Sequence, residues 1–544
     1  MGAFDPVVHV IRLMEHGAPA GFVEQYGDVV DEFVQHPRNL RSVASPGCGK
    51  SNPQQGQNPA DGDSGRAGPV RNGRCSEVPS CAAEVPAYCK ARNMSAASRT
   101  VVFACALSGA AMNMAVAGEA PWRLQEALTP PDGFSIGLVH MSRFESIGNN
   151  PRAGSSPDDS MIVQRTILDT RYRRGGVEAQ LELYDARQQL ADDDAFLTNS
   201  AINALEVLQA TLSFDLPNEG SVRFGRLATD WGSRRFLARN RFRNAINAFD
   251  GVEWIQPLAN GGVMRLFGSQ VVRRLPSDRI GLLDNERIMD ESSSAQRFHA
   301  VNYTLPTASA AFNTDLFWFY LREKDFPGVA TGNRRIHTAG LRLRKPATSG
   351  EIDFEIESMM QFGDSGIEIV GQSRPNLDHR AHFHYAAVGY SFPNSLRAVL
   401  EFDYASGDAV SHDLENGRFD SLFGVTTFEF GVVGMYQPFS RSNLVTPGIR
   451  LFANPRPDLN VMVSYRHFWL AETYDIWGRT KRRYMGQVNV PDEDNYLGQH
   501  LEYRIRWDVI PGNLQLDTGA IFLKANGLFE ENTRYGFIGA VFTF

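Results

Sequence analysis

A repeating unit of about ten residues is the feature that most restricts how this chain can fold. From Phe134 to the last residue, apolar and polar side chains alternate in short stretches separated by turn-like connections. In residues 396–405, for example, Leu400 and Phe402 alternate with Glu401 and Asp403. Side chains along a strand point to the two faces of a sheet in turn, so a period of two predicts β-strands. The unit predicts an all-β fold, and alternation alone fits both a soluble sandwich and a transmembrane barrel.

The lengths of the connections distinguish these two architectures. Short turns, such as residues 173–176 and 510–513, alternate strictly with long polar segments, such as residues 230–247 and 406–442. Outer-membrane barrels have short periplasmic turns and long extracellular loops. We therefore predict a closed antiparallel transmembrane β-barrel of about eighteen strands with both termini on the periplasmic side. The predicted strands are 134–145, 161–172, 176–187, 202–215, 220–229, 248–257, 262–272, 296–305, 313–323, 336–345, 351–362, 380–391, 396–405, 443–453, 459–470, 498–509, 514–525 and 534–544.

Composition excludes several other classes of protein. The formal net charge of -8 argues against a nucleic-acid binder, which would present a basic surface. The mean hydropathy is -0.29 and long apolar runs do not recur, which excludes a bundle of membrane helices. All five cysteines lie at or before Cys105, and their spacing fits no zinc site. We expect neither a bound metal nor a cofactor.

The region before the barrel divides into two parts. Residues 94–117 contain a Met, a positive charge at Arg99, an apolar stretch and Ala-Val-Ala, which is the order of a secretory signal peptide. Residues 1–93 are rich in Pro, Gly, Gln and Asn, and we interpret them as a mistaken or disordered extension. The outer-membrane barrel would then occupy residues 118–544. The final YGFIGAVFTF looks like the signal read by the barrel assembly machinery, so we expect the protein in the lipid of the bacterial outer membrane. We also expect it to be a monomer.

Arginine dominates the basic residues of the expected barrel, since residues 118–544 contain forty arginines and four lysines. A guanidinium is always charged and offers two coplanar donors to a carboxylate, which suits a channel that handles carboxylates. The alternation predicts lumen positions for Arg143, Arg165, Arg171, Arg226, Arg265, Arg322, Arg342, Arg397, Arg466, Arg504 and Arg506. It predicts the same for Glu145, Asp169, Asp353, Glu355, Glu357, Glu401, Asp403, Glu502 and Asp508. These charges suit a bracing lattice of salt bridges, a selectivity zone for a polyanion, or both.

Several longer motifs resemble one known family. The stretches FGRLATDWGSRRFLARNRFRNAINAFDGVEWI (residues 224–255), RHFWLAETYDIWG (residues 466–478) and YASGD (residues 404–408) are similar to the alginate-export outer-membrane proteins. The resemblance covers nearly all of residues 132–544 and implies an eighteen-stranded porin whose electropositive pore passes a secreted polyuronate. It matches Arg226 to the family's G-R motif and Arg243 to the arginine before F-D-G, although Leu227 stands where the family commonly has Gln.

The residues and the resemblance together give a set of expected substrate-binding side chains. The set consists of Arg165, Arg226, Arg243, Arg342, Asp353, Arg397, Arg504 and Arg506. We predict a channel for an anionic polysaccharide or an organic anion, with periplasmic export components as further partners and no nucleic acid. One alternative is an uptake porin for small organic molecules. A third hypothesis is an outer-membrane hydrolase built on His382, His384 and Ser391, which the sequence favours least because it carries none of the usual hydrolase motifs.

Overall fold

The computed structural model describes residues 121–151, 155–195, 197–306, 312–327, 331–369, 372–410, 413–432, 434–473, 475, 495–526 and 531–544. The predictions for residues 1–93 and 94–117 lie outside the described residues. Within the described residues the helices are α4 (Leu124–Leu128), α5 (Arg279–Leu283) and α6 (Thr427–Phe430). None of these helices is long and apolar enough to cross a bilayer.

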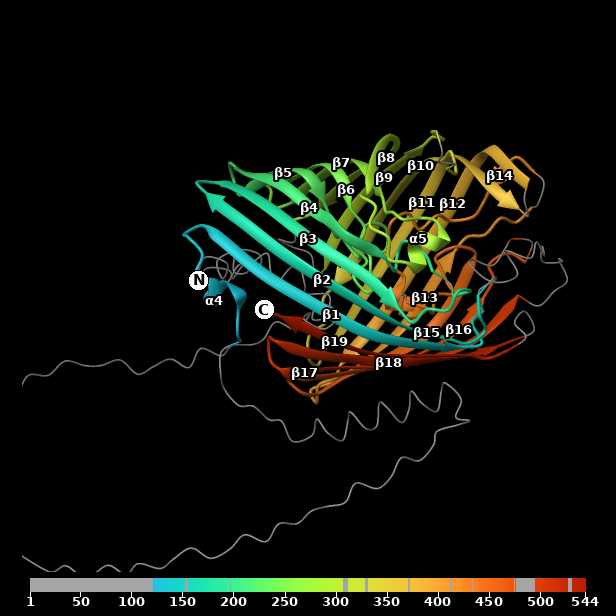
Figure 1. Ribbon diagram of the computed structural model, residues 1–544. Helices are drawn as coiled ribbons and strands as arrows, with labels where there is room; N and C mark the ends of the chain where they lie inside the picture. Colours follow the sequence, from blue (N-terminus) through green and yellow to red (C-terminus); the bar gives the residue numbers. More distant parts are fainter. Residues whose placement is uncertain are drawn as a thin grey trace, which may run out of the picture. The chain divides into compact units, whose positions relative to one another are not determined.

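Eighteen long strands form the wall of a closed antiparallel barrel (Figure 1). The last strand pairs with the first, so the ring has no open edge. A further two-residue strand, β14 (Glu415–Asn416), pairs with β12 inside a long connection. The wall strands are β1 (Phe134–Gly148), β2 (Asp159–Arg174), β3 (Val177–Gln189), β4 (Asn203–Leu216), β5 (Gly220–Leu227), β6 (Phe249–Pro257), β7 (Val263–Arg273), β8 (Glu291–Thr304), β9 (Asn313–Glu323), β10 (Arg335–Lys345), β11 (Ile352–Ile369), β12 (Gln372–Ser391), β13 (Leu396–Ala405), β15 (Leu444–Arg456), β16 (Leu459–Trp469), β17 (Tyr496–Ile510), β18 (Leu514–Ala525) and β19 (Thr533–Thr543).

The alternation of side chains separates an apolar outer face from a polar inner face. In β13, Leu400 and Phe402 are exposed on the outer surface, whereas Glu401 and Asp403 are buried inside. The exposed side chains of a soluble protein would be the polar ones, so this inversion is that of a wall facing lipid. The predicted architecture of eighteen alternating strands is confirmed.

The hairpin of β11 and β12 extends well beyond its predicted length. The sequence pattern predicts a loop over residues 363–379, but backbone pairing continues from Asp364 opposite Asp378 to Ile369 opposite Gln372. These residues are more polar than the wall because they lie past the apolar band of the barrel. Polarity therefore marked the edge of the membrane and not the end of the strands.

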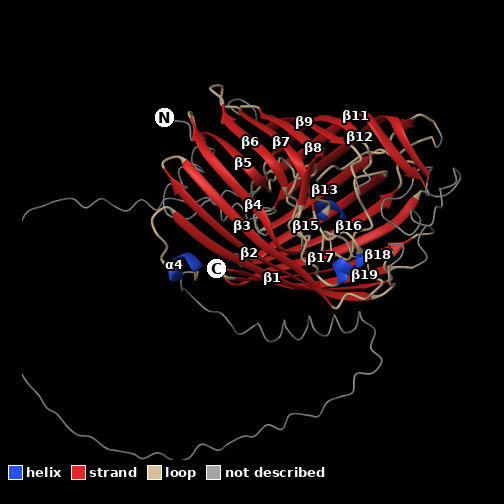
Figure 2. Cartoon of the chain, turned by 45° about the horizontal axis from the view of Figure 1, so that its top comes forward, coloured by secondary structure: helices blue, strands red, loops and turns tan. Residues whose placement is uncertain are grey.

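Two long connections lie inside the barrel, as the loops within the ring in Figure 2 show. We call residues 228–248 the β5–β6 segment and residues 406–443 the β13–β15 segment. The Phe423 N–H donates to the Phe236 carbonyl across 3.0 Å, and the Ala238 N–H donates to the Phe423 carbonyl across 3.2 Å. Each segment therefore provides backbone partners that the other needs in the barrel interior.

The barrel wall holds both segments with buried polar side chains. Arg165 of β2 donates to the carbonyl oxygens of Arg241 and Arg243 in the β5–β6 segment, in both cases across 2.8 Å. Glu145 of β1 accepts the Met435 N–H of the β13–β15 segment across 2.8 Å. Buried backbone groups without water need such partners, so these wall residues fix the position of the segments.

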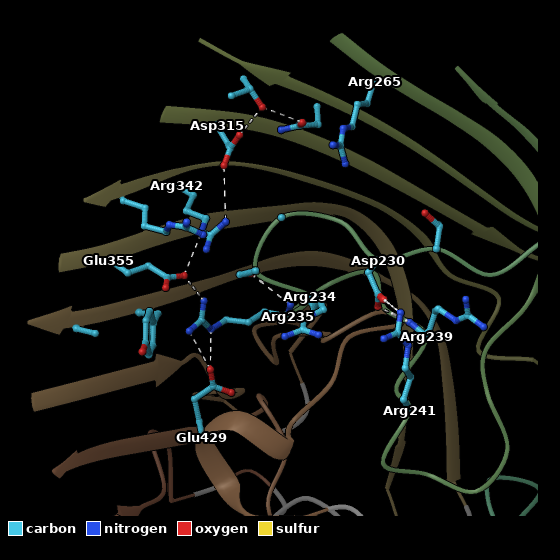
Figure 3. A pocket seen from close by; sticks show the side chains of 18 of the residues that line it. Asp230, Arg234, Arg235, Arg239, Arg241, Arg265, Asp315, Arg342, Glu355 and Glu429 are labelled. Carbon is cyan, nitrogen blue, oxygen red and sulfur yellow. Dashed lines mark hydrogen bonds and ion pairs between the residues drawn. The ribbon is translucent and has the colours of Figure 1, made fainter. Parts of the chain in front are cut away.

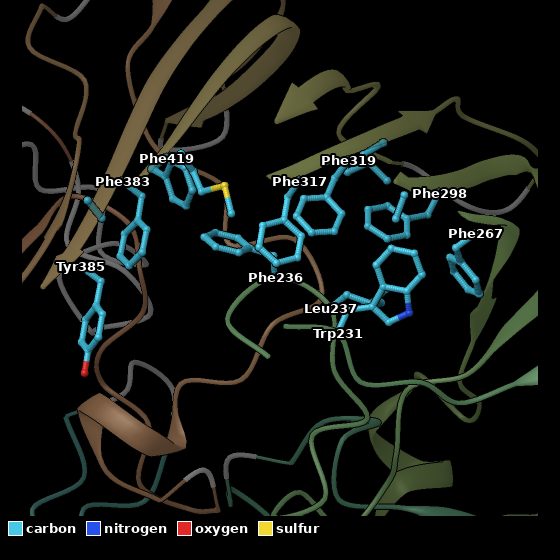
Figure 4. Packing of buried hydrophobic residues seen from close by; sticks show 14 of the residues in the cluster. Trp231, Phe236, Leu237, Phe267, Phe298, Phe317, Phe319, Phe383, Tyr385 and Phe419 are labelled. Carbon is cyan, nitrogen blue, oxygen red and sulfur yellow. The ribbon is translucent and has the colours of Figure 1, made fainter. Parts of the chain in front are cut away.

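An apolar core fills part of the barrel interior between the segments and the wall (Figure 4). Phe236 of the β5–β6 segment packs against Phe319 and Phe383 of the wall, with ring centroids 6.0 and 5.6 Å apart. Phe419 of the β13–β15 segment packs against Phe236 and Phe383, with ring centroids 5.9 and 5.4 Å apart. Such aromatic packing excludes water, so the two segments are fixed parts of the interior.

Candidate functional site: an arginine-rich cavity inside the barrel

A cavity of about 780 Å³ lies between the inner segments and the wall (Figure 3). Its lining comes from β2 to β13, from β15 and from both inner segments. The charged lining comprises twelve basic and eight acidic side chains, so the surface carries a formal excess of positive charge. The basic residues are Arg171, Arg223, Arg234, Arg235, Arg239, Arg241, Arg265, Arg342, Arg344, Lys345, Arg397 and Arg450.

Arg235 lies where the β5–β6 segment meets the wall and the other inner segment. Its guanidinium donates to Glu355 of β11 across 2.7 Å and to Glu429 of the β13–β15 segment across 2.9 Å. The same group lies 3.6 Å from the centroid of the Tyr385 ring. Burial opposes its charge, but the nearby carboxylates prevail and raise the pKa of Arg235. Arg235 is thus a permanently charged structural joint of the cavity.

Arg234, the preceding residue, sits among like charges. Burial, with Arg241 and Arg342 close by, lowers the pKa of the Arg234 guanidinium to about 10. Burial is the largest cause of this shift, and the like charges of Arg241 and Arg342 add to it, so these three guanidinium groups form a region of positive potential. The guanidinium still carries its proton at neutral pH, so its positive charge attracts an anion to this part of the cavity.

Several wall arginines are neutralised by carboxylates across the cavity lining. Arg342 donates to Glu355 across 2.9 Å, so this one carboxylate serves both Arg342 and Arg235. Arg397 binds Asp353 with two donors, at 3.1 and 2.5 Å. Two-pronged pairs of this kind hold the guanidinium in one orientation. They line the cavity with donors that a carboxylate ligand can share.

Arg265 of β7 differs from these paired residues. Its side chain projects into the cavity in Figure 3. Within the part of the chain that the structure describes, it makes neither a hydrogen bond nor an ion pair. A solvated guanidinium in a cavity can accept an anionic ligand without first breaking a protein contact.

No group of His, Cys, Asp and Glu side chains among the described residues is arranged to hold a metal ion.

Comparison with known proteins decides the family of the chain. Residues 133–527 match the family described as alginate export.

The chain belongs to the alginate-export family.

Solved outer-membrane proteins share the fold of this alginate-export family member. OccAB2 of Acinetobacter baumannii is 13% identical, with a TM-score of 0.51, and the match covers 76% of this chain and 98% of that one. OccAB1 of the same organism is 10% identical, with a TM-score of 0.50, and the match covers 76% and 97%. No curated protein matches the chain in sequence. The family and the fold are those of outer-membrane porins, which places the chain in the bacterial outer membrane.

In this alginate-export protein, three of the eight predicted binding residues line the cavity, namely Arg342, Asp353 and Arg397. The others do not. Arg165 and Arg243 meet where the wall holds the β5–β6 segment. Arg504 of β17 donates to Asp517 across 2.8 and 2.6 Å, and Arg506 lies 4.0 Å from the same carboxylate.

The lumen positions predicted for Arg226 and Arg322 are wrong. Arg226 lies three residues after Arg223, which lines the cavity, and residues three apart in a strand face opposite sides. Arg226 instead binds Asp250 at 2.9 Å outside the cavity lining. In β9 the residues on either side of Arg322, Leu321 and Glu323, are buried inside, so Arg322 faces outward.

Among the twelve basic side chains that line the cavity, the sequence analysis missed the four that the β5–β6 segment contributes. Arg234, Arg235, Arg239 and Arg241 belong to a connection that was expected to be extracellular. One signal was present in the sequence, because five arginines occur between Trp231 and Asn244 with apolar residues among them. Such a stretch suits a buried segment better than a solvated loop.

The three residues of the hydrolase hypothesis are not assembled into one site. His382 and His384 alternate with Ala381, Phe383 and Tyr385, whose side chains are buried inside, and the two histidines therefore lie on the outer face. Ser391 is buried on the inner face of the same strand. His384 contacts His382, with its Nε2 atom 3.0 Å from His382 Nδ1, and Ser358, whose hydroxyl lies 2.9 Å from its Nδ1 atom, but not Ser391.

Proposed function

We propose that this protein is a passive outer-membrane channel for an anionic saccharide of the polyuronate class. The observation that carries the proposal is the excess of basic side chains around the inner cavity, concentrated in the β5–β6 segment. Fixed guanidinium groups attract carboxylates and, at several sites in succession, let them pass from one site to the next. Membership of the alginate-export family supports the same class of solute.

The pairing within the cavity supports transport and not permanent binding. The carboxylates of Asp353 and Glu355 already occupy Arg397, Arg342 and Arg235. A uronate carboxylate would exchange with these internal partners, so each contact gains little net free energy. Arg265 provides a contact that requires no exchange. A succession of weak sites is what conduction requires.

Planar-bilayer recordings test the proposal. Reversal potentials in a salt gradient should show anion selectivity, and a short oligomannuronate should block the current where a neutral maltooligosaccharide of equal length does not. The double substitution Arg234→Gln/Arg265→Gln should weaken the block roughly tenfold or more, because each lost contact is charge-assisted. Arg187→Gln is the matched control, since Arg187 binds Asp185 at 2.9 Å outside the lumen. Cation selectivity without block would reject the proposal.

The alternative is an uptake porin for small organic anions, and the size of the cavity favours it. The inner segments occupy much of the lumen, and a cavity of about 780 Å³ has the volume of a small-molecule site. Liposome-swelling rates with a uronic acid monomer and with its oligomers separate the two functions. Uptake of small anions predicts swelling with the monomer alone, whereas polyuronate transport predicts swelling with both.

A further inference from the structure

Three arginines lie side by side on the outer face of the barrel. Arg297 of β8 is directly opposite Arg322 of β9, and Arg322 is directly opposite Arg335 of β10. Their neighbours in the three strands, Phe298, Leu321 and Ile336, are buried inside, so the three guanidinium groups extend from the outer face. We call Arg297, Arg322 and Arg335 the outer arginine row.

An aromatic row lies two residues further into the membrane on the same strands. His299, Tyr320, His337 and Phe362 are aligned across β8 to β11. Tyr320 and His337 have ring centroids 4.5 Å apart, and His337 and Phe362 are stacked at 5.2 Å. Aromatic girdles mark the boundary between the hydrocarbon core and the headgroups.

The outer arginine row lies on the headgroup side of this boundary. Two residues of a strand correspond to about 7 Å, which is the step from the hydrocarbon edge into the headgroup layer. The row is close to the long connections, because β9 ends at Glu323 and β10 begins at Arg335. Long connections face the outside of the cell, so the row meets the outer leaflet.

The described residues on that face balance only one of the three charges of the row. Like charges directly opposite each other on neighbouring strands are destabilising. Arg335 has a carboxylate partner, Asp364, at 3.2 Å, and Arg297 donates to the Ser294 carbonyl across 3.1 Å. Among the residues described, Arg322 has no acidic partner, although it stands between the other two.

Glu323, which is adjacent to Arg322 in the chain, does not supply the missing charge. Its carboxylate is buried on the inner side and accepts two hydrogen bonds from Arg334, both across 2.7 Å. Lys324 follows directly and adds a further positive charge at the end of β9. An anionic headgroup of the membrane would therefore neutralise the charge that the described residues leave unpaired in the row.

We propose that the outer arginine row binds the phosphates of a phosphorylated saccharolipid of the outer leaflet, the lipid A class. Guanidinium groups bind phosphate oxygens with two coplanar donors, and three of them at one height suit a sugar headgroup that carries more than one phosphate. The sugar would lie against the ring faces of His299 and Tyr320, which stack at 6.1 Å. Its acyl chains would extend along Val301 and Trp318, the next pair on the outer face.

Native mass spectrometry of the full-length protein, released from detergent micelles, tests this site. The probes are lipid A with both phosphates, the same lipid after enzymatic removal of its phosphates, and phosphatidylglycerol. The wild-type protein should retain the phosphorylated lipid A and release the other two. The substitution Arg297→Gln/Arg322→Gln should weaken retention roughly 30-fold, since each arginine near an anionic surface contributes about a fivefold factor.

The control is Arg187→Gln/Arg380→Gln, because these outward arginines already have partners in Asp185 and Asp378. The control variant should retain phosphorylated lipid A as the wild-type protein does. Equal retention of the dephosphorylated lipid, of phosphatidylglycerol, or by the Arg297→Gln/Arg322→Gln variant would overturn the proposal. Displacement of the lipid by inorganic phosphate alone would also overturn it, because it would indicate a site for the free ion. If the double variant does not fold, the wild-type protein alone tests the proposal: it should retain phosphorylated lipid A and release the dephosphorylated lipid and phosphatidylglycerol.

Discussion

Arg235 donates its Nε–H to Glu429 across 2.9 Å and so joins the two segments that fill the barrel. Both side chains are almost completely buried. The pair therefore connects two regions of the chain that are nearly two hundred residues apart in sequence. It holds one side of the cavity in place.

Removing the Arg235–Glu429 ion pair should make the two inner segments more mobile while the strands of the barrel wall stay paired. Arg235→Met leaves the Glu429 carboxylate buried with one partner fewer, and breaking a buried pair costs about 3–5 kcal/mol. We expect a higher and noisier single-channel conductance, while the heat-modifiable shift of the folded barrel on SDS gels persists. Arg187→Met, on the outer face, serves as the control and should leave the conductance unchanged. An Arg235→Met channel with wild-type conductance would contradict the role assigned to this pair.

Gly424 should be irreplaceable where the two segments meet. A Cβ at this position would lie 1.7 Å from the Arg235 carbonyl oxygen and 2.8 Å from the Phe236 nitrogen. Backbone atoms cannot move aside as a side chain can, so Gly424→Ala should separate the segments at a cost of at least about 1–3 kcal/mol. Limited proteolysis should then cut the segments faster. Gly539→Ala, whose Cβ would meet its nearest neighbour at an ordinary 3.4 Å, should be cut at the wild-type rate.

The pair of Arg397 and Asp353 should set the ion selectivity in opposite directions. Asp353→Asn removes a negative charge from the cavity and releases Arg397, so the ratio of anion to cation permeability should rise roughly fivefold, from about 1 kcal/mol per charge. Arg397→Gln leaves Asp353 unneutralised and should lower the ratio by a similar factor. Reversal potentials measured in a salt gradient give both ratios. Changes of the same sign in the two variants would show that the pair acts only on folding.

The β13–β15 segment should lose stability as the pH rises. Burial, together with the nearby Asp475, raises the pKa of Asp408 to about 6 from its ordinary 3.8. A carboxyl whose pKa is raised by folding stabilises the fold while protonated, and this contribution disappears as the pH rises through about 6. The protection factor of the Gly417 amide, which donates to Asp408 at 3.2 Å, should therefore be lower at about pH 7 than at about pH 5 once the intrinsic pH dependence of exchange is divided out.

Asp408→Asn provides the corresponding test at constant pH. The amide keeps an acceptor for Gly417 but carries no charge, so it should stabilise the segment at neutral pH by about 1–3 kcal/mol. It should also abolish the difference in protection factor of the Gly417 amide between the two pH values. A variant that still shows the pH dependence would assign it to another group.

Most of the wall was predictable from the sequence because its lipid face obeys a simple alternation. The strand predicted at residues 396–405 coincides with β13, and the one at 514–525 coincides with β18. Arg342, Asp353 and Arg397 were correctly expected in the lumen on the same basis. A strand with lipid on one side and a polar interior on the other has a sequence in which apolar and polar residues alternate, and this pattern is easy to recognise.

The alternation fails where the interior is apolar. In β9, Phe317, Phe319 and Leu321 face inward and Trp318 and Tyr320 face outward, so both sides of the strand are hydrophobic. Nothing in the strand itself shows which way Arg322 points. The missing information lies in the β5–β6 segment, whose Phe236 covers the inner side of the strand. Tertiary packing of a connection, far away in sequence, decides the orientation.

The same missing information explains why the part of the cavity formed by the inner segments was not foreseen. Arg234 and Arg235 reach the cavity only because the β5–β6 segment folds inward, and neither residue belongs to a strand. The inward fold depends on wall contacts such as that of Arg165 with the carbonyl of Arg243. Long-range contacts of this kind have no local signature.

The aromatic core that joins the inner segments to the wall has an evolutionary consequence. The groups that would meet a solute lie on the two inner segments and on the inward-facing positions of the wall strands, whereas the residues that meet lipid lie on the outward-facing positions. Selection for a new cargo can therefore act on the inward-facing positions and the inner segments alone. The surface that must be inserted into the membrane can stay as it is while the repertoire of transported molecules diversifies.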